Sequence, residues 1–383
     1  MKDVAIVKCE TYTPEECEAA LSAVLQPLGG LSWVKPGMKI AIKANLVSAM
    51  KPEKAATTHP TLLAALTRLL LAHGASSVVI GDSPGGLYNA AFLNRVYAAT
   101  GMHEAEEAGA VLNRDFSQNN ADFPEAHIAK HFTYTAYLDE ADAIISFCKL
   151  KSHGMMSMSA ATKNLFGVIP GTMKPEYHFR YPDPMDFAGM IVDLNLYFKP
   201  RLFLVDAVEA MEGNGPTAGT PRHMGALLAG TDCHKVDLVC AKLIGLDPMA
   251  VPTLRAAADF GLISESADEV AVSGDLEEFA LADFQRIERK RSLQFESILP
   301  GKAGKVFSKI AQKALRSSPR LHKSECVGCG LCKNVCPAKA IEIVEKKARI
   351  DKSKCIRCFC CQEFCPKGAM KVHRPLPARI LNR

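Results

Sequence analysis

Nine of the 14 cysteines fall between residues 326 and 365, and one spacing occurs twice among them. Each copy reads Cys-x2-Cys-x2-Cys-x3-Cys-Pro, and the second copy lies 29 residues after the first. The opening residues, MKDVAIVKCE, lack the apolar segment of a signal peptide, so we expect a cytoplasmic protein. Thiols stay reduced in that compartment, and the repeated spacing therefore predicts metal binding rather than disulfides.

The likeness of the two copies extends beyond the cysteines, as a comparison of SECVGCGLCKNVCPAKAI with SKCIRCFCCQEFCPKGAM shows. This is the spacing of bacterial ferredoxins with two [4Fe–4S] clusters, in which the fourth cysteine of each copy binds the other cluster. Three thiolates two residues apart can bind three corners of one cluster, while the Cys-Pro turn directs the fourth thiolate away. The sequence thus predicts two ligand sets: Cys326, Cys329, Cys332 and Cys365 for the first cluster, and Cys355, Cys358, Cys361 and Cys336 for the second.

Zinc is the alternative for such cysteines, because zinc sites also use pairs of the form Cys-x2-Cys. Zinc would leave the third cysteine and the Cys-Pro turn of both copies unexplained. The second copy also contains Cys360, which falls outside the repeated spacing. We interpret Cys360 as a small packed thiol; an additional ligand or a redox sensor is the alternative.

A basic connector precedes the cysteine repeat. Residues 286–323 hold eleven Lys or Arg and two acidic residues, whereas the whole chain has a net charge of +5. Residues 305–316 place their apolar side chains on one helical face. We expect a helix packed on its own protein, with docking to an acidic partner or peripheral membrane contact as alternatives. Nucleic acid is not an expected partner, because no recognised fold or aromatic platform accompanies the charge.

No transmembrane segment is expected either. The most apolar window, LLAALTRLLLAHGASSVVIG, is interrupted by Arg68 and His73 and falls short of the roughly 18 apolar residues of a membrane span.

Residues 1–285 alternate short β-branched runs with longer amphipathic ones. VAIVKC is followed by PEECEAALSAVLQPL, and KIAIKANLV by HPTLLAALTRLLLAHG. This alternation predicts an α/β domain with a mainly parallel sheet and helices on both faces. We therefore expect three regions: the α/β domain at 1–285, a basic, partly helical linker at 286–321, and a small α+β dicluster ferredoxin-like domain with the tail at 322–383.

Polar residues follow four of the predicted strands, and ligands of parallel sheets bind beyond the carboxyl ends of the strands. The candidates for catalysis are Lys151, His153, Lys163 and His59. The candidates for substrate binding are Lys43, Asn45, Asp82, Asn164, Asp206 and Glu212. The lysines would bind a small anionic metabolite and a histidine would supply protons. The acids would orient these groups or hold a divalent cation.

Each of these candidates has a structural alternative. GDSPGG and EGNGP are also good turn sequences, and a loop histidine is more often hydrogen-bonded than a metal ligand. No G-x-G-x-x-G opens a helix after a strand, and no G-x-x-x-x-G-K-[ST] occurs. A typical dinucleotide fold and a P-loop ATPase are therefore not supported. A flavin or a divalent metal stays open, although no motif supports either.

One combination of segments resembles a known family. VKPGMKIAIKANLV, VVIGDSPGG, KLKSHGMMSMSAATKNLFGVIPGTMKPEYH and VDAVEAMEGNGPTAGT precede the two cysteine copies. Together they resemble the iron–sulfur branch of the family called domain of unknown function 362. The resemblance covers nearly the whole chain and brings no substrate with it. It implies that the segments containing Lys151, His153, Lys163 and Asn164 form one signature.

Three functions compete on this basis. The first is an oxidoreductase that relays electrons from a redox partner protein, through two [4Fe–4S] clusters, to a substrate or bound cofactor on the α/β domain. The second is a ferredoxin-type electron carrier or adaptor without its own catalysis. The third is a metal-centre assembly factor, for which Cys148, Cys233 and Cys240 give only faint support.

Overall fold

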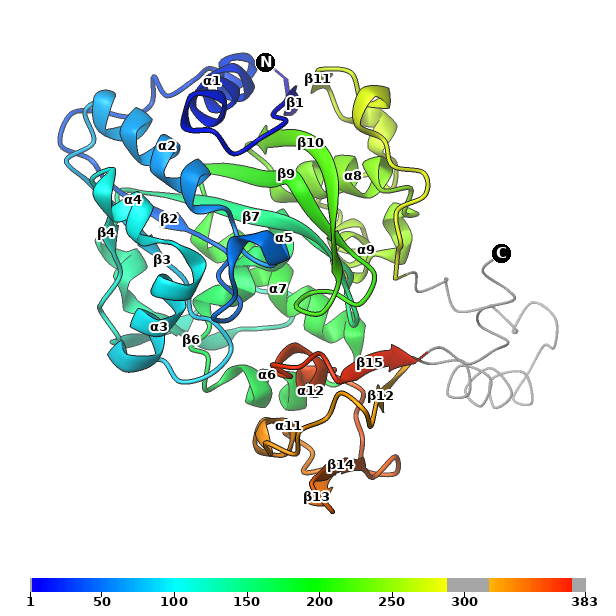
Figure 1. Cartoon of the computed structure of the whole chain (residues 1–383). Coiled ribbons are helices and arrows are strands. Elements are labelled where there is room, and N and C mark those ends of the chain that lie inside the picture. Colours follow the sequence, from blue (N-terminus) through cyan, green and yellow to red (C-terminus); the bar gives the residue numbers. More distant parts are fainter. Residues whose placement is uncertain (1, 288–316, 374–383) are drawn as a thin grey trace.

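A mixed sheet of nine strands lies at the centre of the larger unit of the molecule (Figure 1). This computed structural model describes residues 2–287 and 317–373, so most of the predicted linker, including its helical stretch, lies outside the described residues. The strands of the sheet are, in chain order, β1 (Val4–Lys8), β2 (Lys39–Lys43), β3 (Ser77–Gly81), β4 (Val111–Leu112), β7 (Ala143–His153), β8 (Ser157–Ser159), β9 (Leu202–Glu212), β10 (Thr220–Gly230) and β11 (Val272–Ser273).

The half of the sheet that carries most of the candidate residues is parallel. β2 pairs in parallel with β3 and with β7, and β7 pairs in parallel with β9. β10 runs antiparallel between β9 and β1. Side chains of successive residues point to opposite faces, so Ile40 and Ile42 join one hydrophobic core and Ala41 joins the other.

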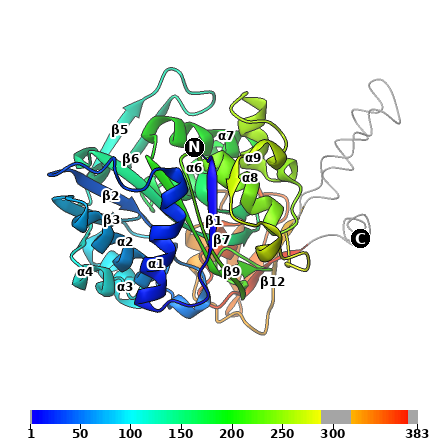
Figure 2. The same ribbon diagram turned by 90° about the horizontal axis from the view of Figure 1, so that it is seen from above.

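Helices cover both faces of this sheet (Figure 2). One face is covered by α1 (Pro14–Leu25), α2 (Pro60–Ala72), α3 (Ala90–Thr100) and α4 (His103–Glu107). The other is covered by α5 (Ala161–Asn164), α7 (Pro184–Phe198), α8 (Cys233–Leu243) and α9 (Pro252–Asp259). The predicted α/β class, with a mainly parallel sheet and helices on both faces, is confirmed.

Local sequence explains where several helices begin. Asp183 caps α7 and Asp232 caps α8, each accepting a bond from a backbone N–H group of the first turn. Asn89 does the same for α3, which ends at Gly101 in the left-handed conformation. No helix within residues 2–287 and 317–373 is long and apolar enough to cross a membrane.

The smaller unit contains two short strand pairs and two short helices. β12 (Ser318–Leu321) pairs with β15 (Met370–His373), so strand pairing in this unit starts before residue 322. β13 (Ile341–Val344) pairs with β14 (Lys347–Ile350). The helices α11 (Leu331–Asn334) and α12 (Cys360–Glu363) lie within the two cysteine copies. Two further strands, β5 (Gln118–Asp122) and β6 (His131–Thr135), form a separate pair in the larger unit.

The two units meet at one end of the long strand β7. Its residues run past the ends of β2 and β3 and fold back into β8, with Lys151 opposite Ser159. Gly154, at the tip of this hairpin, lies against Gln362 of α12. Figure 1 shows α12 and β15 packed below the sheet, beside α6 (Lys174–Arg180).

Candidate functional site

The cysteine thiols of the smaller unit form two groups, each of which draws on both copies of the repeat. Burial, together with the neighbouring thiols Cys365, Cys326 and Cys329, raises the pKa of Cys332 to about 11. The same four cysteines line one small cavity. Around Cys361 the neighbouring thiols are Cys358, Cys355, Cys332 and Cys336. The fourth cysteine of each copy therefore lies with the first three of the other.

This arrangement fits iron–sulfur clusters. The Sγ atoms of Cys336 and Cys365 each accept a bond from the backbone N–H four residues later, at 3.2 Å in both cases. Such bonds stabilise thiolate ligands. Within the described residues, no group of three or more His, Cys, Asp or Glu side chains is close enough to hold a single metal ion. A cubane differs in this respect, because its four thiolates bind four separate irons and stand further apart.

The second copy of the repeat packs into the larger unit. Phe359 has a backbone φ of +63°, where its counterpart in the first copy is Gly330 at +81°. A left-handed phenylalanine costs roughly 1–2 kcal/mol, so its burial must offset that cost. Its side chain is 1% exposed and belongs to the hydrophobic core of the larger unit. Cys360, next in the chain, is also buried, as expected for a packed thiol.

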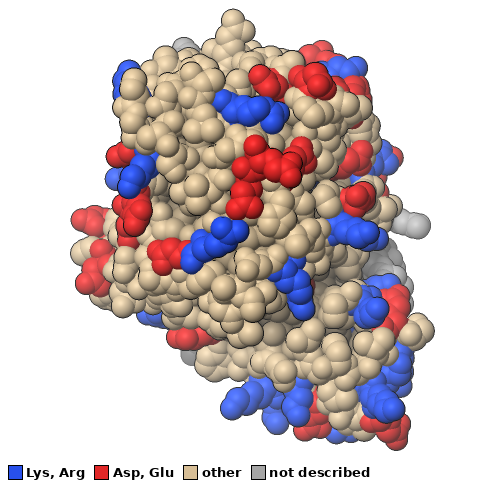
Figure 3. Space-filling model, turned by 60° about the vertical axis from the view of Figure 1, so that its left-hand side comes forward, with Lys and Arg blue, Asp and Glu red and all other residues tan. Residues whose placement is uncertain are grey.

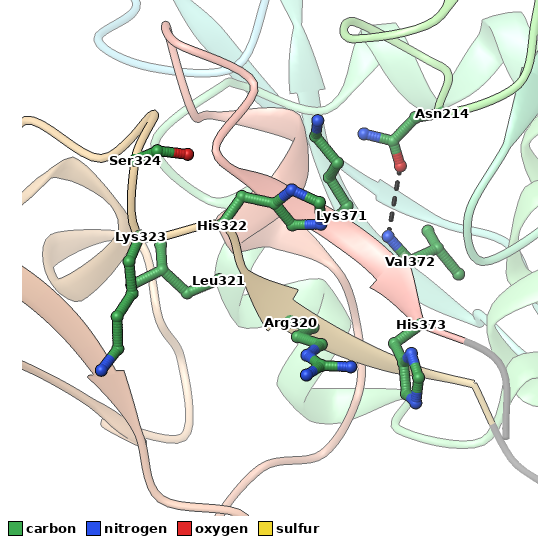
Figure 4. Close-up of a pocket in the computed structure, with 9 residues that line it drawn as sticks. All are labelled: Asn214, Arg320, Leu321, His322, Lys323, Ser324, Lys371, Val372 and His373. Carbon is green, nitrogen blue, oxygen red and sulfur yellow. Dashed lines mark hydrogen bonds between the residues drawn. The ribbon is translucent and has the colours of Figure 1, made fainter.

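Hydrogen bonds fix α12 against the loop after β9. The side-chain amide of Gln362 donates to the carbonyl of Gly215 at 2.8 Å and to that of Asn214 at 3.0 Å. Asn214 in turn accepts a bond from the backbone N–H of Val372 at 3.2 Å (Figure 4). A Cβ added to Gly85 would lie 2.5 Å from the Phe364 ring, so a glycine is needed there for close approach. We call the contacts of residues 359–364 with the larger unit the seam.

His153, the last residue of β7, meets Glu363 at the seam. Its Nδ1 accepts backbone N–H bonds from Met155 and Met156, at 3.1 and 3.0 Å. The proton of the neutral ring is therefore on Nε2, which lies 2.8 Å from Oε1 of Glu363. Burial lowers the pKa of His153 to about 4, which keeps the ring neutral. Burial alone would raise the pKa of Glu363, but His153, Lys163 and His178 together lower it well below its ordinary value.

Two lysines lie over one aromatic ring beside this pair. The Nζ atoms of Lys163 and Lys174 lie 5.8 and 5.4 Å from the centre of the Phe166 ring. Burial lowers the pKa of Lys163, and it lowers the pKa of Lys174 to about 8. Lys174 donates to the carbonyl of Ser83. Lys163 has no hydrogen-bond or ion-pair partner within the described residues.

The short helix α5 positions Lys163. Asp237 of α8 accepts the backbone N–H groups of Ala161 and Thr162, at 2.7 and 3.1 Å. These are first-turn donors that have no partner within the helix itself. His178 lies near Lys163 and stacks on Phe187, with ring centres 4.3 Å apart. Its Nδ1 is buried and has no hydrogen-bond partner in the described part of the chain.

Five of the predicted residues form one buried network at the ends of β2, β3 and β7. Lys43 is 0% exposed and lies 2.8 Å from Asp82. The Nζ of Lys151 donates to the side chain of Asn45 at 2.6 Å, and Asn45 donates to Asn164 at 3.0 Å. Burial, with the charge of Lys163, lowers the pKa of Lys151 to about 7. The network satisfies its own members, as buried polar groups require.

A second buried network surrounds Asp206. Lys149 lies 2.7 Å from its carboxylate, and the Tyr12 hydroxyl donates to the same group at 2.9 Å. The His59 ring stacks on Tyr12, with centres 3.6 Å apart, and burial lowers the pKa of His59 to about 4. Glu212 is elsewhere and accepts the backbone N–H of Gln285. The structure thus divides the predicted acids among separate partners instead of gathering them.

Sequence reasoning missed Lys174, Tyr12, Phe359, Gln362 and Glu363, and it did not include His178 among the candidate site residues. A signal for three of these residues is present in the repeat. The second copy has Phe359, Gln362 and Glu363 where the first has Gly330, Lys333 and Asn334. The cysteine spacing does not require these differences, and they are the residues that dock.

The outer surface of the smaller unit is basic. Residues 317–373 contain twelve Lys or Arg and five acidic residues. Figure 3 shows blue side chains along the lower edge of the molecule, over this unit. A hollow of about 680 Å³ opens beside Asn214, and Arg320, His322, Lys323 and Lys371 are among its lining residues (Figure 4). Lys371 is paired with Glu325 at 2.7 Å.

Comparison with known proteins places two family models on the chain. The model described as domain of unknown function (DUF362) matches residues 40–242, and the model of a 4Fe–4S dicluster domain matches residues 318–366. The chain therefore contains an iron–sulfur domain with a role in electron transfer.

One curated relative is the thylakoid-associated protein sll1697 of Synechocystis. It is 32% identical over 273 residues, which cover 70% of this chain and 82% of that protein. Two solved structures are remotely similar. A Thermotoga maritima protein has a TM-score of 0.35 at 10% identity, over 57% of this chain. The lactate racemase apoprotein of Thermoanaerobacterium thermosaccharolyticum has a TM-score of 0.40 at 12% identity, over 62% of this chain. The match spans 56% of each of these two proteins.

Proposed function

This chain belongs to the DUF362 family, and we propose that it is an oxidoreductase in which the iron–sulfur unit delivers electrons across the seam to a small anionic molecule. The observation that carries the proposal is the insertion of α12 into the larger unit. This helix contains Cys361, a predicted cluster ligand, and Glu363, which contacts His153. One cluster site is therefore adjacent to the buried basic groups.

The two predicted cysteine sets would hold two [4Fe–4S] clusters. Such clusters accept and release single electrons. The set with Cys355, Cys358, Cys361 and Cys336 lies toward the seam. The other set includes Cys329, which is exposed. We propose that a redox partner protein exchanges electrons on that exposed side.

The residues of the larger unit would bind the acceptor and supply protons. Lys163, which has no ion-pair partner in the described structure, would bind an anionic group, with Lys174 as a second cation. The Nε2–H of His153 faces the seam and would donate a hydrogen bond to the acceptor; because burial keeps this ring neutral, it would orient the acceptor and not supply the proton. Lys43, Asn45, Lys151 and Asn164 would hold α5 and the end of β7 in place. His59, Asp206 and Glu212 keep their proposed roles in proton supply and orientation, at a distance from this contact.

One observation favours the second function, an electron carrier or adaptor. Lys43, Lys149 and Lys151 are each at most 1% exposed and already have partners within the chain. Lysines whose charges are already balanced by partners within the chain can have a purely structural role. Nothing similar favours a metal-centre assembly factor, because Cys148, Cys233 and Cys240 are packed in the core and burial raises the pKa of each thiol.

The place of the protein in the cell belongs to the same proposal. A cytoplasmic location is still our expectation. The relative from Synechocystis is named for its association with thylakoids. If this chain also contacts a membrane, we propose that the basic linker at 286–321 makes the contact.

The test is anaerobic. The clusters of the purified full chain are reduced stoichiometrically, excess reductant is removed, and reoxidation is followed spectroscopically as pools of small metabolites are added. We expect reoxidation with some pools, and loss of this response in Lys163→Ala but not in Lys51→Ala, a control at an exposed lysine. Clusters that stay reduced with every pool, yet discharge to a second redox protein, would support the carrier instead.

A further inference from the structure

Glu363 is an acidic side chain among basic groups that come from a different unit. Its carboxylate is 2.8 Å from His153, and the charge of Lys163 also acts on it. The other carboxylate that acts on Lys163 and Lys174 is Asp82, which is already paired with Lys43 at 2.8 Å. Glu363 is therefore the carboxylate available to balance Lys163 and Lys174.

The larger unit leaves polar groups without partners at this place. His178 is 2% exposed, and its buried Nδ1 has no hydrogen-bond partner within residues 2–287 and 317–373. Lys163 contacts the Phe166 ring but has no acceptor within the described residues. Buried polar groups usually have partners, so the unpaired Nδ1 of His178, beside the half-buried Lys163, indicates a site for something else.

Cluster binding does not require a carboxylate at position 363. The first cysteine copy has Asn334 at the equivalent position, which is the last residue of the corresponding short helix α11. Glu363 is brought to His153 by the anchoring of Phe359 and Gln362, not by the ligand spacing. The smaller unit thus supplies this carboxylate to a group of residues that belong to the larger unit.

We propose that the basic groups at the seam form an oxyanion site, and that Glu363 occupies it as an internal substitute for a small carboxylate or phosphate ligand. The ligand competes with Glu363 for Lys163, Lys174 and the unpartnered nitrogen of His178. This inference rests on the proposed function in one respect, because it identifies the ligand with the electron acceptor. Binding of an oxyanion at this site can be measured whether or not the protein transfers electrons.

The competition can be measured by calorimetry on the full, cluster-loaded chain with oxidised clusters. Inorganic phosphate and oxalate are the two probes, titrated separately so that the two oxyanion classes are distinguished. Glu363→Gln keeps the size of the side chain and an acceptor for His153 but removes the charge. We expect it to bind at least one probe about tenfold more tightly than the wild type, since a competing charge is gone. The double variant Lys163→Met/Glu363→Gln should lose this gain.

Glu345→Gln is the matched control, because it removes the same charge from an exposed position on the same unit. Equal tightening in Glu345→Gln, or no change in Glu363→Gln for either probe, overturns the proposal. If Glu363→Gln fails to retain its clusters, Lys163→Met in the otherwise native chain decides. Its affinity for whichever probe the native chain binds should fall, and an affinity equal to that of the wild type would overturn the proposal. If the chain binds an oxyanion as expected but no metabolite reoxidises its clusters, the proposed function is wrong and the oxyanion site stands.

Discussion

The carboxylate of Glu363 lies 2.8 Å from Nε2 of His153, and this contact joins the second cysteine copy to the last residue of β7. The two residues are brought together by the docking of α12, since no short segment of chain connects them. The contact is also where the predicted ligands of one cluster come near the signature residues of the larger domain.

Phe359→Gly should release α12 from the larger unit while the cysteine loop keeps its shape. Glycine adopts the left-handed conformation of residue 359 without strain, as Gly330 does in the first copy. The variant loses a buried aromatic side chain, a change that typically costs about 3–5 kcal/mol. Hydrogen exchange of residues 360–364 should therefore accelerate strongly. The amides of α11 serve as an internal reference, and equal acceleration there would mean that the whole unit had unfolded.

Cys358→Ala should lower the iron content of the protein, whereas Cys360→Ala should leave it unchanged. Cys358 is a predicted ligand, whereas Cys360 is a buried thiol outside the repeated spacing. We expect Cys360→Ala to keep the iron content of the parent chain. Cys358→Ala should lose iron and the fold of the smaller unit, because so small a unit depends on its metal for stability. Iron and sulfide analysis of the two proteins, purified anaerobically side by side, checks this. Loss of iron in both would make Cys360 a ligand.

Lys43→Met should destabilise the larger unit by about 3–5 kcal/mol, because it leaves the Asp82 carboxylate buried and unpaired. Urea unfolding followed by the fluorescence of Trp33, the one tryptophan of the chain, measures the free energy of unfolding. The double variant Lys43→Met/Asp82→Leu should recover a large part of the loss, since it removes both charges. If the single and double variants are equally unstable, packing rather than the charge pair is responsible.

His178 should make the protein less stable as the pH falls below about 6.5. Burial lowers the pKa of His178 to about 3, so the unfolded chain binds a proton that the folded chain excludes. Its contribution is fully present above the unfolded pKa of about 6.5 and is lost progressively down to the folded value. Between pH 7 and 5 this amounts to about 2 kcal/mol. His178→Phe should flatten the fall in urea midpoint over that range, and an unchanged slope would contradict the assignment.

Gly85→Val should prevent docking by steric contact alone. A Cβ at this position would lie within 3.1 Å of three atoms of the Phe364 ring. We expect the variant to keep its clusters and its larger-unit stability but to lose any metabolite-dependent reoxidation. Leu87→Val, at an exposed position in the same loop, is the control. Normal reoxidation in Gly85→Val would show that docking at the seam is not needed.

The sequence by itself determined the parts of this protein that depend on local spacing. Turn geometry sets which thiols can reach a common centre, so the crossed cysteine sets could be derived from the intervals between residues. Alternating apolar runs predicted the α/β class, because strand and helix periodicities are local properties. Parallel strands end at one edge, which is why Lys43, Asp82 and Lys151 could be expected there together.

Only the tertiary structure decided which of these groups are already satisfied. Lys43 and Lys151 have hydrogen-bond or ion-pair partners from distant segments, whereas Lys163 has none among the residues that the structure describes, and no spacing in the chain distinguishes them. The docking of Phe359 and Glu363 depends on the shapes and charges of two surfaces that are far apart in sequence. Burial then shifts the pKa of His153 and Lys174 through desolvation, which exists only once the units have packed.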